Sequence, residues 1–402
     1  MTSADVAILG AGPAGLFLAR MLSLQGRRVV VLERAARERC LTRVRAAILE
    51  HPTRVVMDEL GVGDRIAREG EAHSGFYVRH EGVTHRFDFA SLLGRHAWLY
   101  PQHEVVRDLV EALERDGVDL RFETEVTDIA DGAESIVVTA QTADGPVRVE
   151  AAYAAACDGR HGAGRAAALA GDTDVRAYHR ALPHAWLGIL ARTAPDPDEG
   201  MYAMHPRGMS LHSMRGPRIT RQYLQVPAGT RLDDWPDERI WAELRLRSAS
   251  LDHPPLATGE IFDRSVIPLS ATVLEPMRRG RLFLVGDAAH LMPPTGAKGL
   301  NLAVSDAGVL SAAVQAALGH GDTSLLDAYS ATALARVWES ESFSWEMTEL
   351  LHTLDDDPFS WRLRSARLRR LVGDVDAQRA LGAVYLGTPF PASWRYTPGS
   401  TP

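Results

Sequence analysis

A chain of 402 residues is long enough for two or three domains, and its formal charge of −8 argues against a nucleic-acid-binding surface. Hydrophobic residues make up 46% and charged residues 24% of the sequence, as in ordinary soluble proteins. Two cysteines cannot build a disulfide framework, and no apolar run approaches the ~20 residues of a membrane span. A predicted strand follows Met1 almost directly and leaves no room for a signal peptide, so we expect a soluble cytoplasmic protein.

The first predicted element is a buried strand over residues 5–9 that enters a Gly-x-Gly-x-x-Gly turn at Gly10, Gly12 and Gly15. An apolar helix over 16–24 and a second strand over 28–32 follow, and this strand closes on Glu33. The order of strand, glycine turn, helix and acid is the fingerprint of a dinucleotide site, in which the turn approaches a pyrophosphate. An acid at this place favours an unphosphorylated ribose, as in FAD or NAD.

Five arginines occupy the next twelve residues, 34–45. They form either the solvated face of a helix or a surface that binds phosphate oxygens beside the dinucleotide. Further along, an amphipathic helix covers 105–113 after Gln102, and strands are predicted near 120–122 and 136–139. Asp158 and Gly159 then form a turn at the end of another strand.

From about 176 to 267 the pattern changes to alternating, aromatic-rich segments separated by Pro and Gly turns. This pattern is typical of an antiparallel sheet. Because the block lies between two pieces of the nucleotide-binding region, we interpret it as an inserted domain. Substrate pockets commonly form at such a seam.

The stretch 281–301 combines a strand over 282–285, a Gly286-Asp287 turn and a Gly-rich loop that leads into a helix near Leu300. The acid at the strand end can accept hydrogen bonds from a ligand hydroxyl, and the loop offers unpaired N–H groups to an electron-rich ligand. Lys298, within this loop, is the only lysine in the chain. The remaining sequence is predicted to be helical to its end, over 302–318, 325–353 and 359–385.

Taken together, these motifs resemble the class A flavoprotein aromatic monooxygenases, and more closely the p-hydroxybenzoate hydroxylase family. The resemblance covers nearly the whole chain and includes residues 10–15 with Glu33, 45–50, 157–159, 202–208, 223–227, 275–301, 343–345 and 385–389. It implies an α/β fold, with a Rossmann-like FAD-binding domain, an inserted antiparallel β-sheet substrate domain and a C-terminal helical segment.

The family architecture predicts the following division of the chain. The FAD-binding domain comprises 1–73, 101–175 and 268–345, the substrate domain comprises 74–100 and 176–267, and the C-terminal helical segment, 346–402, forms a homodimer.

The implied activity is insertion of one oxygen of O2 ortho to the phenol of 4-hydroxybenzoate, which gives 3,4-dihydroxybenzoate. In this family the oxygen comes from a flavin C4a-hydroperoxide, and NAD(P)H reduces the flavin. Because this hydroperoxide is a modest electrophile, the ring must lose its phenol proton, which ordinarily titrates near ~10. Only one dinucleotide fingerprint is present in the sequence, and it is assigned to FAD. The resemblance implies that the pyridine nucleotide binds on the surface, without a second Rossmann unit.

The family's site residues carry over to positions in this sequence. Those for the substrate are Ser213, Arg215 and Tyr223 at its carboxylate, and Tyr202, Tyr385 and the backbone of Pro294 at its phenol oxygen. His73 matches the solvent end of a proton relay, where an unperturbed pKa near ~6.5 suits exchange with water. The residues that match the family's FAD-binding positions are Gly10, Gly12, Gly15, Glu33, Arg45, Gln102, Asp158, Gly286, Asp287, Gly296, Lys298, Gly299, Leu300 and Asn301. Those for NAD(P)H are Arg34, Arg39, Arg43, Arg45, His161 and Arg165, and no metal is expected.

Three departures from the family leave questions open. Gly200 replaces a leucine near the substrate ring, which predicts space for a 3-substituted substrate such as 3-amino-4-hydroxybenzoate or 3,4-dihydroxybenzoate. Arg39 replaces an aromatic residue that in some members reads the 2′-phosphate, so both NADPH and NADH remain candidates, and the added charge favours NADPH. Ala47 and His51-Pro52 also differ from the family's usual Gly and Gln-Gly beside the flavin, and the sequence does not predict how they affect movement of the isoalloxazine.

Two other classes of protein were weighed. An FAD-dependent dehydrogenase, oxidase or halogenase would share the nucleotide motifs, but the Trp-x-Trp-x-Ile-Pro segment of halogenases is missing from the sequence. A non-catalytic FAD-binding protein would be expected to lose the relay pair, yet Tyr202 and Tyr385 are both present.

Overall fold

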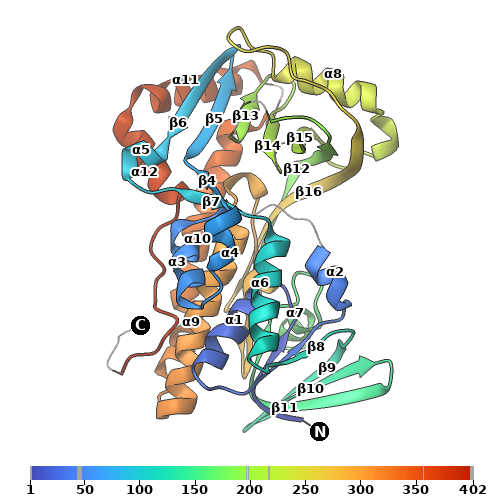
Figure 1. The fold of residues 1–402 in the computed structure, drawn as a ribbon, viewed down its shortest axis with the longest axis vertical. Helices are drawn as coiled ribbons and strands as arrows, with labels where there is room; N and C mark the ends of the chain where they lie inside the picture. Colours follow the sequence, from blue (N-terminus) through green and yellow to red (C-terminus); the bar gives the residue numbers. More distant parts are fainter. Residues whose placement is uncertain are drawn as a thin grey trace.

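The computed structural model describes residues 2–42, 48–195, 197, 199–215, 218–355 and 357–398. The molecule is elongated, with a large sheet at each end, and the long helices α9 (Gly299–His320) and α10 (Ser324–Leu351) run along its length (Figure 1). Both predicted kinds of sheet are present, together with C-terminal helices, so the predicted fold class is confirmed.

The lower sheet has the strand order β17-β18-β11-β1-β2-β8, and β9 and β10 extend it beside β11. Its four central pairings are parallel, and the second half of β1 and all of β2 are apolar and buried, as expected for inner strands covered on both faces. The strands are β1 (Thr2–Leu9), β2 (Val29–Leu32), β8 (Asp119–Arg121), β9 (Glu125–Asp131), β10 (Ile136–Thr142), β11 (Gly145–Ala156), β17 (Arg278–Arg279) and β18 (Leu282–Leu284). The helices beside them are α1 (Pro13–Leu24), α2 (Arg37–Thr42), α6 (Gln102–Arg115) and α7 (Ala163–Ala168).

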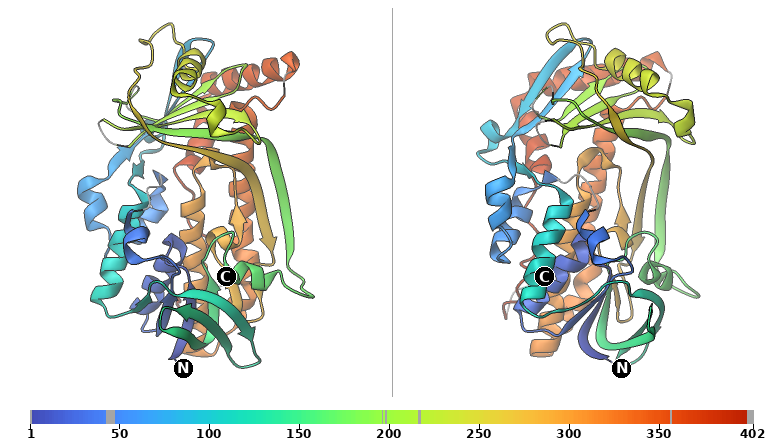
Figure 2. Two further views of the ribbon diagram at one scale, coloured as in Figure 1. Left: turned by 90° about the vertical axis from the view of Figure 1, so that its right-hand side faces the viewer. Right: turned by 45° about the vertical axis from the view of Figure 1, so that its right-hand side comes forward.

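The upper sheet has the order β19-β16-β12-β15-β14-β13-β5-β6, and it is antiparallel except where β13 pairs with β5. Its strands are β5 (Gly75–His80), β6 (Val83–Asp88), β12 (Arg176–Ala191), β13 (Met201–Met204), β14 (Ser210–Met214), β15 (Thr220–Pro227), β16 (Ile261–Glu275) and β19 (His290–Leu291). Two of them, β12 and β16, continue as a long ribbon down one side of the molecule (Figure 2).

Two hydrophobic clusters cover opposite faces of the upper sheet. One face packs against α8 (Asp237–Arg247), mainly through Trp241 and Leu244. The other face packs against α10, α11 (Pro358–Gly373) and α12 (Val375–Tyr385), and its cluster includes Tyr202 and Tyr385. The aromatic side chains singled out in the sequence therefore lie on the inner face, toward the middle of the molecule.

A small sheet, β3-β7-β4, joins the two halves. Its strands are β3 (Ile48–Leu49), β4 (Glu71–His73) and β7 (Ala97–Leu99). The nearby short elements are α3 (His51–Glu59), α4 (Asp64–Glu69) and α5 (Phe89–Leu93), and the remaining ones are η1 (Leu232–Asp234), η2 (Gly286–Ala288) and η3 (Pro294–Gly296). Because β4 ends at His73 and β3 leads into Glu50, this sheet places both residues near the centre of the molecule.

The C-terminal region differs from the single helix predicted over 359–385. It forms α11 (Pro358–Gly373) and α12 (Val375–Tyr385), and the carboxylate of Asp374 accepts the N–H groups of Asp376 and Ala377 at the start of α12. This N-cap separates the two helices. The prediction of helix to the chain end is also wrong, because the described residues after Tyr385 form no helix.

Within the part of the chain that the structure describes, one helix, α9, has the length and apolar composition of a membrane span. Its most apolar window is 78% buried inside the protein, between α1 and α10. Core helices of large domains have this composition, so the apolar character of α9 is explained by its position in the core.

Candidate functional site

The glycine turn after β1 packs tightly against the turn after β11. Gly10 has φ +99°, and a Cβ there would lie 2.7 Å from the carbonyl oxygen of Cys157. A Cβ at Gly15 would lie 2.1 Å from the carbonyl oxygen of Gly10. Gly12, by contrast, has no neighbour within 4 Å of the Cβ position, so open space lies at the N-terminus of α1, where an anion would be favoured.

Two strand-end aspartates lie beside this turn. A Cβ at Gly159 would lie 3.9 Å from the Cβ of Asp287, so the Asp158-Gly159 turn after β11 meets the Gly286-Asp287 turn after β18. Asp158 accepts the N–H of Gly164 through Oδ2 at 2.8 Å, while its buried Oδ1 has no hydrogen-bond partner among the described residues. Burial raises the pKa of Asp158. A buried acceptor without a hydrogen-bond partner can bind a hydroxyl of FAD, and the open N-terminus of α1 beside it can bind the pyrophosphate.

Asp306 of α9 fixes the position of the Gly286-Asp287 turn. Oδ2 of Asp306 accepts the N–H of Gly286 at 2.9 Å and lies 2.7 Å from Nε2 of His290, and both His290 and Asp306 are buried. This carboxylate fixes the turn so that the side chain of Asp287 remains exposed.

Glu33 stands at the end of β2, as the fingerprint predicts. Its carboxylate accepts the N–H groups of Ala11 and Ala35, each at 2.8 Å, and it therefore also holds the glycine turn in place. Because each carboxylate oxygen has further lone pairs, these bonds leave capacity for a ribose hydroxyl.

The residues predicted to bind the pyridine nucleotide differ in their exposure and in their contacts. Arg34 and Arg39 are exposed and make no ion pair among the described residues, whereas His161 is exposed and contacts Arg160. Arg165 donates to the carbonyl of Ala288 at 3.0 Å and is tied to that loop. Arg43 and Arg45 lie outside the described residues, as does Ala47.

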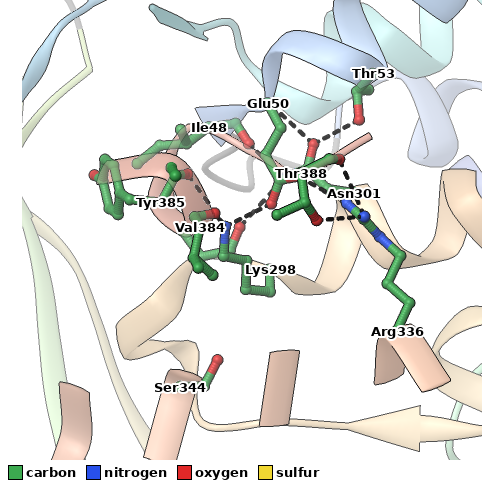
Figure 3. A network of polar contacts seen from close by, with 12 residues as sticks. Ile48, Glu50, Thr53, Lys298, Asn301, Arg336, Ser344, Val384, Tyr385 and Thr388 are labelled. Carbon is green, nitrogen blue, oxygen red and sulfur yellow. Dashed lines mark hydrogen bonds and ion pairs between the residues drawn. The ribbon is translucent and has the colours of Figure 1, made fainter. Parts of the chain in front are cut away.

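A buried network of charged side chains surrounds Lys298, the residue that precedes α9 (Figure 3). Nζ of Lys298 lies 2.7 Å from Oε1 of Glu50, and Nη2 of Arg336 lies 3.1 Å from Oε2 of the same carboxylate. Lys298 also donates to the carbonyl of Tyr385 at 3.1 Å. Two cationic side chains share one carboxylate here, beside Tyr385, and burial lowers the pKa of Lys298 while the charge of Glu50 opposes that shift.

Asn301 fixes the chain around this network. Its Oδ1 accepts the N–H of Glu50 and the hydroxyl of Thr53, and its amide nitrogen donates to Ile48. The other residues predicted here are Gly296, which is packed against Phe343 and Ser344, Gly299 and Leu300, which open α9, and Gln102, which opens α6.

Aromatic side chains gather where the upper sheet meets this loop. Tyr202 donates its hydroxyl to the carbonyl of Thr295 at 3.0 Å, next to Pro294. The ring of Phe76 stands edge-on to both Tyr202 and Tyr385, with centroid distances of 5.4 and 5.0 Å. The two tyrosines are thus brought to the same place, and burial raises the pKa of each.

His73 contacts Tyr385, but its surroundings differ from those expected. Its Nε2 lies 2.7 Å from the hydroxyl of Tyr385, and its side chain is 1% exposed. Burial, with the charge of Arg86 as a second cause, lowers its pKa to about 4. The expectation of an ordinary pKa near 6.5 at a solvent-exposed end is therefore wrong in this structure.

Ser213, Arg215 and Tyr223 come together on the inner face of the upper sheet. Tyr223 pairs with Leu211 across β14 and β15, and its hydroxyl hydrogen-bonds Arg215. Burial lowers the pKa of Arg215, yet no acidic side chain pairs with it among the described residues. Arg221, on the neighbouring strand, is instead paired with Asp263 at 2.9 Å.

Gly200 precedes β13, where Met201 pairs with His212, so continuation of this register places Gly200 opposite Ser213. The nearest atom to a Cβ at Gly200 is the carbonyl oxygen of His212, at 3.9 Å. The backbone has no left-handed φ, so the glycine is not required by conformation. It leaves open space between Ser213 and Tyr202.

Several residues of this site were not assigned from the sequence. Glu50 ends a segment that resembles the family, but its partners are 248 and 286 residues away, which no local pattern reveals. Thr295, Asp306, Arg336 and Phe76 likewise gain their positions only through the fold.

Comparison with known proteins gives consistent matches. A family model described as "FAD binding domain" matches residues 3–344. The p-hydroxybenzoate hydroxylase of Acinetobacter baylyi is 37% identical over 387 residues, which cover 96% of this chain and 95% of that protein.

Solved structures agree with this match. The p-nitrophenol 4-monooxygenase of Pseudomonas putida has a TM-score of 0.82 at 22% identity and covers 96% of this chain and 99% of its own, which indicates a shared fold. The anhydrotetracycline hydroxylase of Streptomyces rimosus has a TM-score of 0.77 at 26% identity, with 96% of this chain and 76% of its own covered.

Proposed function

This chain belongs to the class A flavoprotein aromatic hydroxylases, and within that family we propose that it hydroxylates 4-hydroxybenzoate ortho to the phenol oxygen to give 3,4-dihydroxybenzoate. The chain is a flavin-dependent monooxygenase, and FAD is its cofactor. NAD(P)H as reductant is consistent with the family. The specific substrate and the roles of individual residues are our proposal.

The observation that carries the choice of substrate is the guanidinium of Arg215, which donates to the carbonyl of Met214 but makes no ion pair with any acidic side chain that the structure describes. A partly buried cation without a counter-ion costs free energy, and a ligand carboxylate would offset this cost. A planar guanidinium matches two carboxylate oxygens, and the hydroxyls of Ser213 and Tyr223 complete their hydrogen bonds. This arrangement supports an aromatic acid over a neutral phenol.

The opposite end of the pocket would handle the phenol proton. Tyr202 and Tyr385 lie there together, and when Lys298 is protonated the net positive charge of its network favours an anion. Tyr385 takes the substrate proton as its own proton moves to Nε2 of His73. The lowered pKa of His73 keeps its imidazole neutral, and therefore able to accept, at neutral pH.

FAD would be held by the three converging turns, with Asp158, Asp287 and the N–H groups before α1 and α9 around it. When bound, it supplies the chemistry with O2 that amino-acid side chains lack. The protein orients the substrate ring and excludes water, a task suited to the buried aromatic cluster of Phe76, Tyr202 and Tyr385.

The decisive experiment measures NAD(P)H consumption by the FAD-loaded enzyme with 4-hydroxybenzoate, 3,4-dihydroxybenzoate, 3-amino-4-hydroxybenzoate and 4-aminobenzoate, and identifies products by mass spectrometry. Stimulation by 4-hydroxybenzoate with stoichiometric formation of 3,4-dihydroxybenzoate is expected. Consumption without hydroxylated product from any of the four compounds would overturn the proposal.

A second candidate substrate is a 4-hydroxybenzoate with a small group at position 3, such as 3-amino-4-hydroxybenzoate or 3,4-dihydroxybenzoate. The open space at Gly200 favours it, because that space lies between the proposed carboxylate and phenol contacts. Hydroxylation confined to the 3-substituted rings in the same panel would select this alternative.

We further propose that the protein is a cytoplasmic homodimer that associates through its C-terminal helices. Phe359 and Leu363 support this, since they are 66% and 52% exposed on α11. Light scattering of the purified protein tests the dimer, and a monomeric mass at micromolar concentration would contradict it.

A further inference from the structure

Arg86 of β6 and Glu199, which precedes Gly200, form an ion pair at the edge of the site. Nη1 of Arg86 lies 2.8 Å from Oε2 of Glu199, and the same nitrogen donates to the hydroxyl of Tyr77 at 2.7 Å. The Glu199 side chain is 10% exposed, whereas that of Arg86 is 38% exposed. The pair therefore has a buried acidic end and a basic end that reaches solvent.

This pair is connected to the backbone that carries His73. Oε1 of Glu199 accepts the N–H of Ser74, the next residue, at 2.9 Å. The carbonyl of Gly200 accepts the N–H of Tyr77 at 2.8 Å, so the segment before β13 is tied both to β5 and to Ser74, which precedes β5. Nδ1 of His73 is buried and has no hydrogen-bond partner among the described residues. The position of the ring therefore depends on its backbone and on Tyr385.

The two charges act on different members of the Tyr385–His73 pair. The positive charge of Arg86 lowers the pKa of His73 in addition to burial, and the negative charge of Glu199 raises that of Tyr385, where burial is the main cause. Among the described residues, Tyr385 from α12 hydrogen-bonds His73 and Arg86 from β6 acts on it by its charge, whereas Glu199 acts on Tyr385 and holds the N–H of Ser74. Both effects favour the uncharged forms, which a side chain needs if it is to accept one proton while passing on another.

We propose that the Arg86–Glu199 ion pair is a positioning element of the Tyr385–His73 relay, which anchors the backbone of His73 and sets the charge around both relay side chains. This inference rests on the proposed function, because the relay serves removal of the phenol proton. In that step the substrate O–H bond breaks, Tyr385 gains the proton and gives its own to Nε2 of His73. The product is a phenolate and an imidazolium.

The first test is substrate-free and follows the imidazole of His73 by NMR in the FAD-loaded enzyme, with the His73→Asn variant used to assign the signal. Arg86→Gln removes a positive charge, so the pKa of His73 should rise by ~1 unit. Glu199→Gln removes a negative charge but keeps an acceptor for Ser74, so the pKa should stay or fall. A rise in both variants, as increased hydration alone would cause, overturns the proposal, and so does no change in either.

Two further variants guard against loss of folding as an explanation. Arg86→Lys keeps the charge and should retain the parent titration of His73, so an upward shift as large as that in Arg86→Gln would also refute the proposal. The matched control is Glu260→Gln, which breaks the exposed Arg192–Glu260 pair, 2.9 Å apart, on the same sheet and should change nothing.

The second test measures turnover against pH with whichever benzoate stimulates NAD(P)H consumption. Below the pKa of His73 the relay acceptor is already protonated, so kcat should fall on the acid side. In Arg86→Gln this acid limb should move ~1 unit to higher pH, with little change in KM. If the acid limb of the kcat profile lies at the same pH in Arg86→Gln as in the parent, the inference is contradicted. If no benzoate stimulates consumption, the proposed function fails, while the substrate-free NMR titration still decides the role of the ion pair.

Discussion

Lys298 and Glu50 form a buried ion pair in which Nζ lies 2.7 Å from Oε1, and the two side chains are only 3% and 2% exposed. Arg336 binds the other oxygen of the same carboxylate at 3.1 Å. Burial lowers the pKa of Lys298 and the charge of Glu50 opposes this shift; when Lys298 is protonated, the cluster carries one uncompensated positive charge next to the backbone of Tyr385. In a poorly hydrated site such a charge stabilises a nearby anion far more than it would in water.

Replacing Lys298 by Met should make the bound substrate harder to ionise. Without its ammonium group the cluster becomes neutral, so the phenol of bound 4-hydroxybenzoate should titrate ~1 unit higher. The measurement is the phenolate absorbance of the FAD-loaded complex as a function of pH. Arg192→Gln, which alters an exposed pair, is the control, and an unchanged titration in Lys298→Met would show that the network does not act on the substrate.

The start of the fold was predictable because its signals are local. The apolar strand, the glycine turn and the acid at Glu33 define β1, α1 and β2 within a few residues, and Gly10 has the positive φ that favours glycine. The break at Asp374 also had a local signal, since a Gly-Asp pair can end one helix and cap the next. The continuous helical pattern on both sides concealed it.

The environment of the site was less predictable because it depends on contacts distant in the sequence. His73 meets Tyr385 across 312 residues, and this contact with the surrounding packing buries an imidazole that the sequence suggested was near solvent. Lys298 was conspicuous as the only lysine, yet its partner Glu50 is 248 residues away. Residue types indicated the chemistry, but burial and charge balance required the fold.

Arg215→Gln should weaken binding of carboxylate ligands selectively. Loss of a charge-assisted contact predicts about 10- to 100-fold weaker binding of 4-hydroxybenzoate, measured by flavin fluorescence titration. Phenol, which lacks the carboxylate, should bind equally to both proteins. The ligand-free variant should melt no earlier than the parent, because it no longer buries an unpaired cation. Equal losses for both ligands would contradict the proposed contact.

Gly200→Leu should distinguish plain from 3-substituted substrates. The leucine side chain would occupy the open space opposite Ser213 without backbone strain. We expect kcat/KM for 4-hydroxybenzoate to be retained, and that for 3-amino-4-hydroxybenzoate to fall about 10-fold or more because the pocket becomes overpacked. Gly200→Ala should give an intermediate loss. If both substrates lose activity equally, the space does not border the ring.

The reductant preference can be tested with two arginines of α2 that differ in their pairing. Arg39 is exposed and makes no ion pair among the described residues, whereas Arg37 is held by Glu114 through two bonds of 2.7 and 2.8 Å. If Arg39 contacts the 2′-phosphate, Arg39→Gln should raise KM for NADPH about 5-fold and leave KM for NADH unchanged. Arg37→Gln is the matched control, because its guanidinium is already engaged, and it should affect neither nucleotide. Steady-state kinetics with both nucleotides measures this difference. A parent enzyme that prefers NADH, or an equal loss with both nucleotides in Arg39→Gln, would exclude recognition of the phosphate by Arg39.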